Sequence, residues 1–410
     1  MKKSLTLAVL AAFLLAAPTL AQRKDLKYKL YGFVRTELYY NDRENLAPVE
    51  GNFYLWPLDH SYDADGKDLN RHFNGDFYSF TSRVGMDLSG PGLLGAESSA
   101  KIEADFGGFS SSNTMLRVRQ AYIQLSWKND NLLVGQTWHP MFGSVMPTVL
   151  SIACGAPFQP FNRSPQIRYQ HQADKVKLTT SALWQYQYTS SGPQGGSEEY
   201  IRQGCLPELF AGADWKPNSH VLTGAGFHFI SIAPRTSSVW NDKTYKVSER
   251  MSTYSYEAHF QYHTDDFTFA AKTTMASSLD HCGMMGGYGV TSIDKQTGKQ
   301  DYTAFRHSTS WINFVYGKNW QPDLFIGYSK NLGTEKELVS SKSIYGKGLN
   351  IDQLLFINPG LCYHKAQWEV GVEYTMATAW YGDITASDGK VRDTHTVTNN
   401  HFLAMMMYHF

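Results

Sequence analysis

The sequence predicts an all-β protein, a transmembrane antiparallel β-barrel of about 16 strands. Three observations predict this fold. Apolar and polar residues alternate along most of the chain, short and long connections alternate strictly, and no apolar run is long enough for a spanning helix. Lipid offers no hydrogen-bond partner to a backbone, so a sheet within a membrane must close on itself. An even number of strands, with short turns at one rim and long loops at the other, is typical of outer-membrane barrels.

The N-terminus has the features of an export signal. Two lysines precede an apolar run at 5–17, and small residues end the segment at Ala21. A basic start, a short apolar run and a small-residue cleavage site define a secretory signal peptide. No cysteine stands at the cleavage site, so lipoprotein processing is not expected. We therefore expect residues 1–21 to be removed and residues 22–410 to form a single outer-membrane barrel domain in a Gram-negative bacterium.

The composition suits this class and excludes a nucleic-acid partner. Basic and acidic residues number 37 each, and removing the two lysines of the signal peptide leaves 35 against 37. No basic excess is available for phosphate contacts. Aromatic residues make up 14% of the chain and glycines number 34. A soluble secreted β-sandwich would share this composition, so the periodicity and the connections carry the fold prediction.

Sixteen segments with period-two alternation follow one another along the chain. They are residues 28–40, 77–88, 100–106, 116–127, 132–138, 166–171, 176–184, 209–215, 221–229, 254–262, 267–275, 312–316, 324–328, 355–364, 368–376 and 402–410. In the first, Leu30, Val34 and Leu38 alternate with Arg35 and Glu37. This spacing gives one face to lipid and the other to the lumen.

The connections between these strands fall into two classes. Short turns such as 128–131 and 265–266 alternate with long segments such as 41–76 and 277–304, which are rich in Gly, Ser, Asp and Lys. A Gly-Pro-Gly sequence at 90–92 predicts the first short turn. The last strand alternates apolar residues up to the aromatic C-terminus, a pattern that resembles the recognition signal of outer-membrane barrels.

One long connection is different from the others. Between the fifth and sixth strands, residues 139–162 contain no Asp, Glu, Lys or Arg over 24 residues, and they include four prolines. A loop this long and uncharged is expected to pack against the protein rather than lie in water. We expect it to fold into the lumen from the outer rim and narrow it. The alternative is a buried loop or crossover inside a soluble β protein.

Candidate residues of the solute path come from this loop and from the strands. In a strand, the alternation of faces (its parity) indicates which side chains point into the lumen. Arg35, Arg83 and Arg168 fall on lumen-facing positions, whereas the faces of Arg117 and Arg119 near a strand end are less certain. Guanidinium groups in a narrow pore attract anions and bind carboxylates in a bidentate manner. The full set is Arg35, Arg83, Arg117, Arg119, Trp138, His139, Phe142, Phe161, Arg163 and Arg168.

Each of these assignments has a structural alternative. Any one arginine would equally form a salt bridge to an inward-facing carboxylate, since the predicted lumen also contains Glu37, Glu103, Asp105 and Glu373. The predicted lumen therefore contains charges of both signs, which would set up a transverse electric field across it. The aromatic side chains of the loop would either contact solutes or anchor the loop to the wall, and anchoring is favoured for most of them.

The loop and its flanking strands carry a family resemblance. The blocks Gly135-Gln136-Thr137-Trp138, Met141-Phe142 and 162–169 (NRSPQIRY) resemble the DcaP-like family of trimeric outer-membrane porins. The resemblance implies a homotrimer in outer-membrane lipid, passive diffusion of small solutes, and a preference for anionic solutes such as carboxylates. The heptad-bearing N-terminal segment of some family members is absent, so any trimer would be held together by the barrel wall.

Other function classes receive less support from the sequence. No G-x-S-x-G motif indicates an outer-membrane hydrolase, so we expect no enzyme and no cofactor. Long outer loops leave a binding or adhesion role open. Asp63–Asp68 resembles part of a calcium loop but lacks its last ligand, and the group His281, Cys282, Met284 and Met285 is a weak soft-metal pattern, so no metal is predicted. The pairing of Cys154, Cys205, Cys282 and Cys362 stays open.

Overall fold

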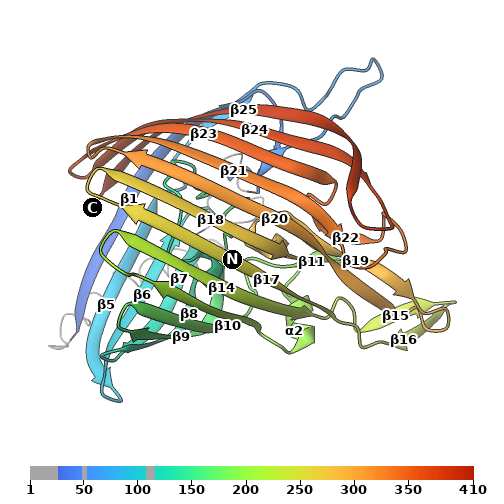
Figure 1. Cartoon of the computed structure of the whole chain (residues 1–410), viewed down its shortest axis with the longest axis horizontal. Helices are drawn as coiled ribbons and strands as arrows, with labels where there is room; N and C mark the ends of the chain where they lie inside the picture. Colours follow the sequence, from blue (N-terminus) through green and yellow to red (C-terminus); the bar gives the residue numbers. More distant parts are fainter. Residues whose placement is uncertain (1–25, 49–52, 108–115) are drawn as a thin grey trace, which may run out of the picture.

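Strand β1 (Lys27–Asn41) pairs with the last strand, β25 (Val391–His409), on one side and with β4 and β5 on the other. This pairing closes a 16-strand antiparallel barrel, as the sequence predicts. The computed structural model describes residues 26–48, 53–107 and 116–410, and Figure 1 shows the strands running obliquely around the barrel. The predicted signal peptide lies outside the described residues. Among these residues, no helix has the length and apolar character needed to cross a membrane.

The barrel strands follow the order of the chain, each paired with its neighbours in sequence. After β1 they are β4 with β5 (Asn74–Tyr78, Arg83–Leu93), β6 (Ala96–Asp105), β7 (Arg117–Ser126), β8 (Asp130–Trp138), β9 (Arg163–Ala173), β10 (Val176–Leu183), β13 (Glu208–Trp215), β14 (Val221–Ile232), β17 (Met251–His263), β18 (Phe267–Ser277), β20 (Gln300–Tyr316), β21 (Trp320–Thr334), β23 (Ile351–Lys365), β24 (Trp368–Ile384) and β25.

The second strand differs from the prediction in two places. It is interrupted at residues 79–82, so β4 and β5 pair separately with the two halves of β1. The predicted turn at 90–92 is instead an irregularity in the pairing of β5 with β6. The chain turns later, at Leu94 and Gly95, whose φ angles are 54° and 75°. Two successive residues in the left-handed region match the twist of a tight hairpin.

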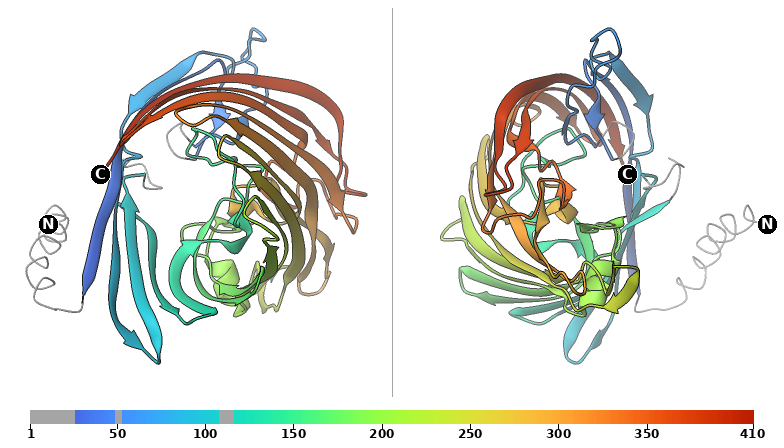
Figure 2. Two further views of the ribbon diagram at one scale, coloured as in Figure 1. Left: turned by 60° about the vertical axis from the view of Figure 1, so that its left-hand side comes forward. Right: turned by 90° about the vertical axis from the view of Figure 1, so that its right-hand side faces the viewer.

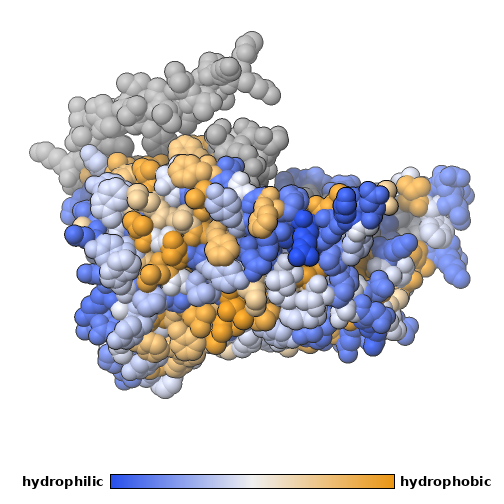
Figure 3. Space-filling model, turned by 90° about the horizontal axis from the view of Figure 1, so that it is seen from above, coloured by the Kyte–Doolittle hydropathy of each residue, from blue (hydrophilic) through white to orange (hydrophobic). Residues whose placement is uncertain are grey.

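The two faces of the wall separate apolar from polar side chains, as alternation requires. On β1, Val34 is 52% exposed on the outer surface, whereas Arg35 and Glu37 are buried inside. Outward residues such as Val372 and Phe402 continue this apolar surface on β24 and β25. In Figure 3 apolar residues gather over much of the barrel, while the end on the right is mainly hydrophilic. This outer face is suited to contact with lipid.

The longer connections contain structure that the sequence prediction treated as loops. Short strands pair there in local hairpins, and β19 pairs with both β20 and β22. The elements are β2 (Asn45–Leu46), β3 (Trp56–Pro57), η1 (Pro140–Phe142), β11 (Ser191–Gly192), β12 (Gly195–Gly196), α2 (Glu199–Gly204), β15 (Ser237–Trp240), β16 (Lys243–Lys246), η2 (Asp280–Cys282), β19 (Gly286–Ile293) and β22 (Ile344–Lys347). In Figure 1 the β15–β16 hairpin projects at the right.

Candidate functional site

The uncharged segment 139–162 leaves the end of β8 and makes hydrogen bonds to strands on the other side of the ring. Lys272 of β18 donates from Nζ to the Met141 carbonyl at 2.7 Å. Asn313 of β20 accepts the Thr148 amide at 2.8 Å and donates to the Thr148 carbonyl at 3.2 Å. These strands lie six and seven places from β8 in the 16-strand ring. In both views of Figure 2 the segment runs inside the ring of strands.

A second set of contacts holds the middle of the segment beside β24 and β1. The Leu150 amide donates to Glu373 Oε2 at 2.5 Å, and Arg35 donates from Nη2 to the Leu150 carbonyl at 2.5 Å. Nearer its end, Gln159 accepts a hydrogen bond from Trp311 Nε1 at 3.0 Å. Buried backbone groups need such partners because water is excluded there. The segment therefore has fixed contacts along its length.

Two glycines in the far wall make room for side chains of this segment. A Cβ at Gly327 of β21 would lie 2.3 Å from the Phe158 ring, and a Cβ at Gly371 of β24 would lie 2.6 Å from Leu150. Phe158 is fully buried, with ring centroids 4.9 Å from Phe356. Each glycine thus allows a side chain of the segment to pack directly on the strand backbone.

We expect Gly327→Ala to displace Phe158 from the wall, because the new methyl group would overlap its ring. Overpacking of this kind destabilises by about 1–3 kcal/mol. Heat-induced unfolding, followed by the gel mobility of the barrel, should occur at lower temperature, and single-channel currents should become noisier. Gly90→Ala is the control, since a Cβ there meets nothing nearer than 3.7 Å. Equal behaviour of the two variants would contradict the proposed packing.

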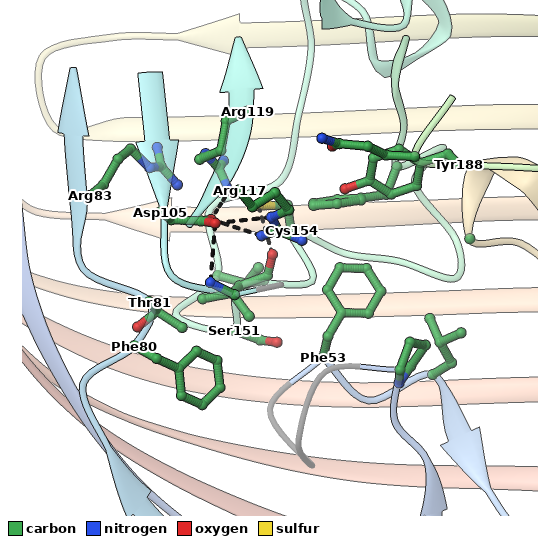
Figure 4. A pocket seen from close by; sticks show the side chains of 18 of the residues that line it. Phe53, Phe80, Thr81, Arg83, Asp105, Arg117, Arg119, Ser151, Cys154 and Tyr188 are labelled. Carbon is green, nitrogen blue, oxygen red and sulfur yellow. Dashed lines mark hydrogen bonds and ion pairs between the residues drawn. The ribbon is translucent and has the colours of Figure 1, made fainter. Parts of the chain in front are cut away.

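A cavity of about 340 Å³ lies between the segment and the wall formed by β1 and β5–β7. Its charged lining is Arg35, Arg83, Arg117, Arg119, Lys347, Asp105 and Asp280, its aromatic lining is Phe33, Phe53, Phe80, Phe161 and Tyr188, and residues 149–152 and Cys154 form the side of the segment. Figure 4 shows Arg117 and Arg119 converging on Asp105, with Arg83 beside them and Ser151 and Cys154 nearby. Burial raises the pKa of the Cys154 thiol, so this group adds no charge to the cavity at neutral pH.

Most of the cavity arginines are paired with carboxylates. Arg117 binds Asp105 in a bidentate manner, with distances of 2.9 Å from Nε and 2.7 Å from Nη2. Arg119 bridges two acids, at 2.7 Å from Asp105 and 2.9 Å from Glu103. Arg35 pairs with Glu37 on its own strand. Glu37, Glu103 and Asp105 therefore stand on the same wall as the arginines, between them.

Arg83 is the cavity arginine with the weakest pairing. Its Nε lies 3.8 Å from Glu103, which Arg119 already binds, and its guanidinium lies 4.8 Å from the centre of the Phe33 ring. About a quarter of its side chain is exposed, at 27%. Four arginines face three acids on this wall, and Lys347 and Asp280 elsewhere in the lining add one charge of each sign. The cavity thus has an excess of positive charge, carried mainly by Arg83.

Arg163 and its neighbours lie behind the cavity. They hold the base of the segment, the place where its first residue, His139, and its last, Asn162, meet. The Arg163 guanidinium is buried, 4.6 Å from the Trp138 ring and 5.1 Å from Phe161, and it donates to the Tyr188 hydroxyl at 2.5 Å. Trp138 also stacks on Phe142, with ring centroids 4.1 Å apart. No carboxylate pairs with Arg163 within the described part of the chain. This aromatic enclosure anchors the start and end of the segment to each other.

The remaining predicted residues lie away from the cavity. Arg168 donates to the Trp138 carbonyl and to Gln166 Oε1, the latter at 2.9 Å. His139 is buried beside Glu208, at 3.5 Å. The structure therefore brings Arg35, Arg83, Arg117, Arg119 and Phe161 together around the cavity, and it places Trp138, His139, Phe142, Arg163 and Arg168 at the base of the segment.

Sequence reasoning missed the cavity residues that come from outer connections. Phe53, Tyr188 and Lys347 all line the cavity, yet none belongs to a strand of the barrel proper. Their segments fold back over the lumen, and a loop has no periodicity that would reveal this path. Phe33 was also missed, although it precedes Val34 in β1 and its inward position could have been read from parity.

Comparison with known proteins agrees with this architecture. The model of a family described as DcaP outer membrane protein matches residues 11–198, a region that includes β1 to β10 and the segment 139–162. This match confirms the resemblance indicated by the sequence blocks and the predicted location in the Gram-negative outer membrane. Among curated proteins, the comparison found no match.

Solved structures share the fold at low sequence identity. The outer membrane channel DcaP of Acinetobacter baumannii is 17% identical, with a TM-score of 0.66 and coverage of 94% of this chain and 98% of that chain. The trimer form of OmpT of Vibrio cholerae is 13% identical, with a TM-score of 0.55 and coverage of 94% and 100%. An anion-selective porin from Comamonas acidovorans is 9% identical, with a TM-score of 0.54 and coverage of 94% and 100%.

Proposed function

We propose that this chain, whose residues 11–198 match the DcaP outer membrane proteins, is a porin through which small hydrophilic solutes diffuse passively. A barrel of 16 strands is wide enough to enclose an aqueous channel. The segment 139–162 narrows this channel, and the cavity beside it is the path that solutes take. A volume of about 340 Å³ is in the range of sites that hold small molecules. No reaction is required for this function, and the protein is not an enzyme.

The excess of positive charge at the cavity favours anions, and carboxylate-bearing solutes in particular. Arg83 is incompletely paired and partly exposed, so its guanidinium is available to a passing carboxylate. The aromatic rings of Phe53, Phe80 and Tyr188 form the rest of the passage and would contact the apolar part of an organic acid. The observation that carries this proposal is the weak ion pairing of Arg83. The Comamonas acidovorans barrel of similar fold is an anion-selective porin.

The assembly proposed for the protein is a homotrimer in outer-membrane lipid. The outer wall at β1, β24 and β25 is apolar, with Val34, Val372 and Phe402 exposed. Such a wall packs either against lipid or against the wall of another copy. The trimer form of the OmpT barrel supports the second arrangement for part of this surface. A binding role through the long outer loops, the alternative from the sequence, stays a prediction.

Reconstitution in planar lipid bilayers tests the proposed function directly. Purified protein should produce discrete conductance steps, and in a potassium chloride gradient the reversal potential should have the sign of preferential chloride passage. A reversal potential of the opposite sign would contradict the anion preference and leave the pore in place. A folded barrel that inserts without any conductance step would contradict the pore itself.

A further inference from the structure

A buried cluster of three histidines and one glutamate lies where the segment 139–162 meets the wall and an outer loop. Glu208 begins β13, His228 belongs to β14, and His281 stands in η2, after β18. His139 completes the group from the start of the segment. Their side chains are at most 2% exposed, and one ligand-type atom from each lies within 4.8 Å of all the others. None of the four residues belongs to the charged wall at β1 and β5–β7, although His281 also lines the cavity.

The distances within the cluster match the ligand spacing of a metal site. His228 Nε2 lies 3.0 Å from Glu208 Oε2, and His281 Nε2 lies 3.1 Å from the same oxygen. Zinc binds imidazole nitrogen and carboxylate oxygen tetrahedrally at about 2.0–2.2 Å, which places neighbouring ligand atoms roughly 3.3 Å apart. The two imidazoles and the carboxylate thus stand close to the positions that a tetrahedral ion requires.

His139 has a different hydrogen-bond partner and therefore a different role. Its Nδ1 accepts the Met141 amide at 3.1 Å, so the proton of a neutral ring resides on Nε2, which points toward Glu208 at 3.5 Å. Gln185 donates to the other carboxylate oxygen at 2.7 Å. Two side chains thus orient the carboxylate from outside, as the hydrogen-bond partners of metal ligands do.

Without an ion, one oxygen of Glu208 must accept hydrogen bonds from three ring nitrogens. A carboxylate oxygen has about two lone pairs for hydrogen bonds. His228 and His281 occupy them, and among the described residues His139 Nε2 has no hydrogen-bond partner. An ion bound by His228 and His281 through their ring nitrogens would free one lone pair of the oxygen for His139. The ion would thus give His139 Nε2 a hydrogen-bond partner, whereas His228 Nδ1 and His281 Nδ1 have none among the described residues in either state.

We propose that Glu208, His228 and His281 bind one divalent transition-metal ion of the zinc type, with His139 and Gln185 positioning the carboxylate. Imidazole and carboxylate ligands suit such ions. The ion would fasten η2 to the wall at β13 and β14, and the hydrogen bond of His139 to Glu208 would link this site to the uncharged segment. Asn162 already donates to the His281 carbonyl at 3.1 Å, and the Phe161 amide donates to the Cys282 carbonyl at 2.7 Å. The ligands are far apart in the chain, which explains why the sequence predicts no metal here.

The test is the metal content of the full-length protein, produced without a histidine tag, folded with zinc and dialysed. Elemental analysis should find one zinc per barrel, and cobalt in place of zinc should produce visible absorption bands of tetrahedral coordination. His228→Gln and His281→Gln should each weaken zinc binding by about tenfold or more. His395→Gln is the control, because His395 pairs with Asp59 at the exposed outer rim and lies outside the cluster.

Wild-type protein that carries no zinc and shows no cobalt bands would overturn the proposal, and this result needs no variant to fold. His139→Gln should retain the ion, so loss of zinc from it would overturn the supporting role assigned to His139. Equal zinc content in His281→Gln and the wild type would overturn the ligand assignment. Conductance in bilayers is a separate readout, because a metal-free barrel that conducts would refute the metal site alone.

Discussion

Reversing the charge of Arg83 should convert an anion-preferring channel into a cation-preferring one. Arg83→Glu would place a new carboxylate beside Glu103 and Asp105, on a wall where four arginines face three acids. The charge of this wall then changes from an excess of cations to an excess of anions. Electrostatic interactions are strong there, because protein walls screen charge less than bulk water.

The measurement is the reversal potential of single channels in a potassium chloride gradient, and we expect a change of about tenfold in the chloride-to-potassium permeability ratio, equivalent to roughly 1.4 kcal/mol. Arg83→Gln should give a smaller change in the same direction. Arg306→Glu is the matched control, since Arg306 pairs with Glu335 away from the cavity and the net charge changes equally. Equal shifts in both reversal variants would indicate a general surface-charge effect and contradict the assigned role of Arg83.

Removing the middle of the uncharged segment should increase conductance several-fold and abolish most ion preference. Gln159 donates from Nε2 to the Phe142 carbonyl at 2.5 Å, so the two ends of the segment are already close together. Residues 144–157 can therefore be replaced by two glycines without stretching the chain. The aromatic contacts of Trp138, Phe142 and Phe161 at the base would stay in place.

The expected gain arises because a 16-strand barrel without an inward segment encloses a wide aqueous channel. The control is an equivalent shortening of the β15–β16 hairpin, where Ser237 pairs with Lys246 and two glycines can join them. That hairpin projects from the outer rim, and its removal should leave conductance unchanged (Figure 1). Unchanged conductance in the shortened-segment variant, with the barrel still folded, would contradict a narrowing role for residues 144–157.

Much of the barrel could be predicted because a strand in a barrel wall requires alternating apolar and polar residues, a pattern that is visible within one segment of the sequence. Alternation at Leu30, Val34 and Leu38 gave the first strand and the direction of Arg35. The interruption of the second strand at 79–82 and the turn at Leu94 were not predicted. Backbone angles at such places depend on the partner strand, so the sequence of one segment alone does not determine them.

The candidate site could be predicted only in part, for a related reason. Parity placed Arg35 and Arg83 in the lumen, but it could not show that Glu103 and Asp105 stand between the arginines on one wall. Ion pairs of that kind depend on strand register, which only the folded sheet determines. The same limit applies to Lys347, which reaches the cavity from a short strand in an outer connection.

The glycines at 327 and 371 fit the shape of the far wall to the uncharged segment. This fit restricts which substitutions either the wall or the segment can accept. A larger residue at 327 would require a smaller one at 158, and the same reciprocity joins 371 with 150. Transferring the segment into another barrel should therefore succeed only if glycines are also introduced at the two wall positions that it contacts. We therefore expect substitutions at 327 and 371 to alter the width of the channel, as substitutions in the segment itself would.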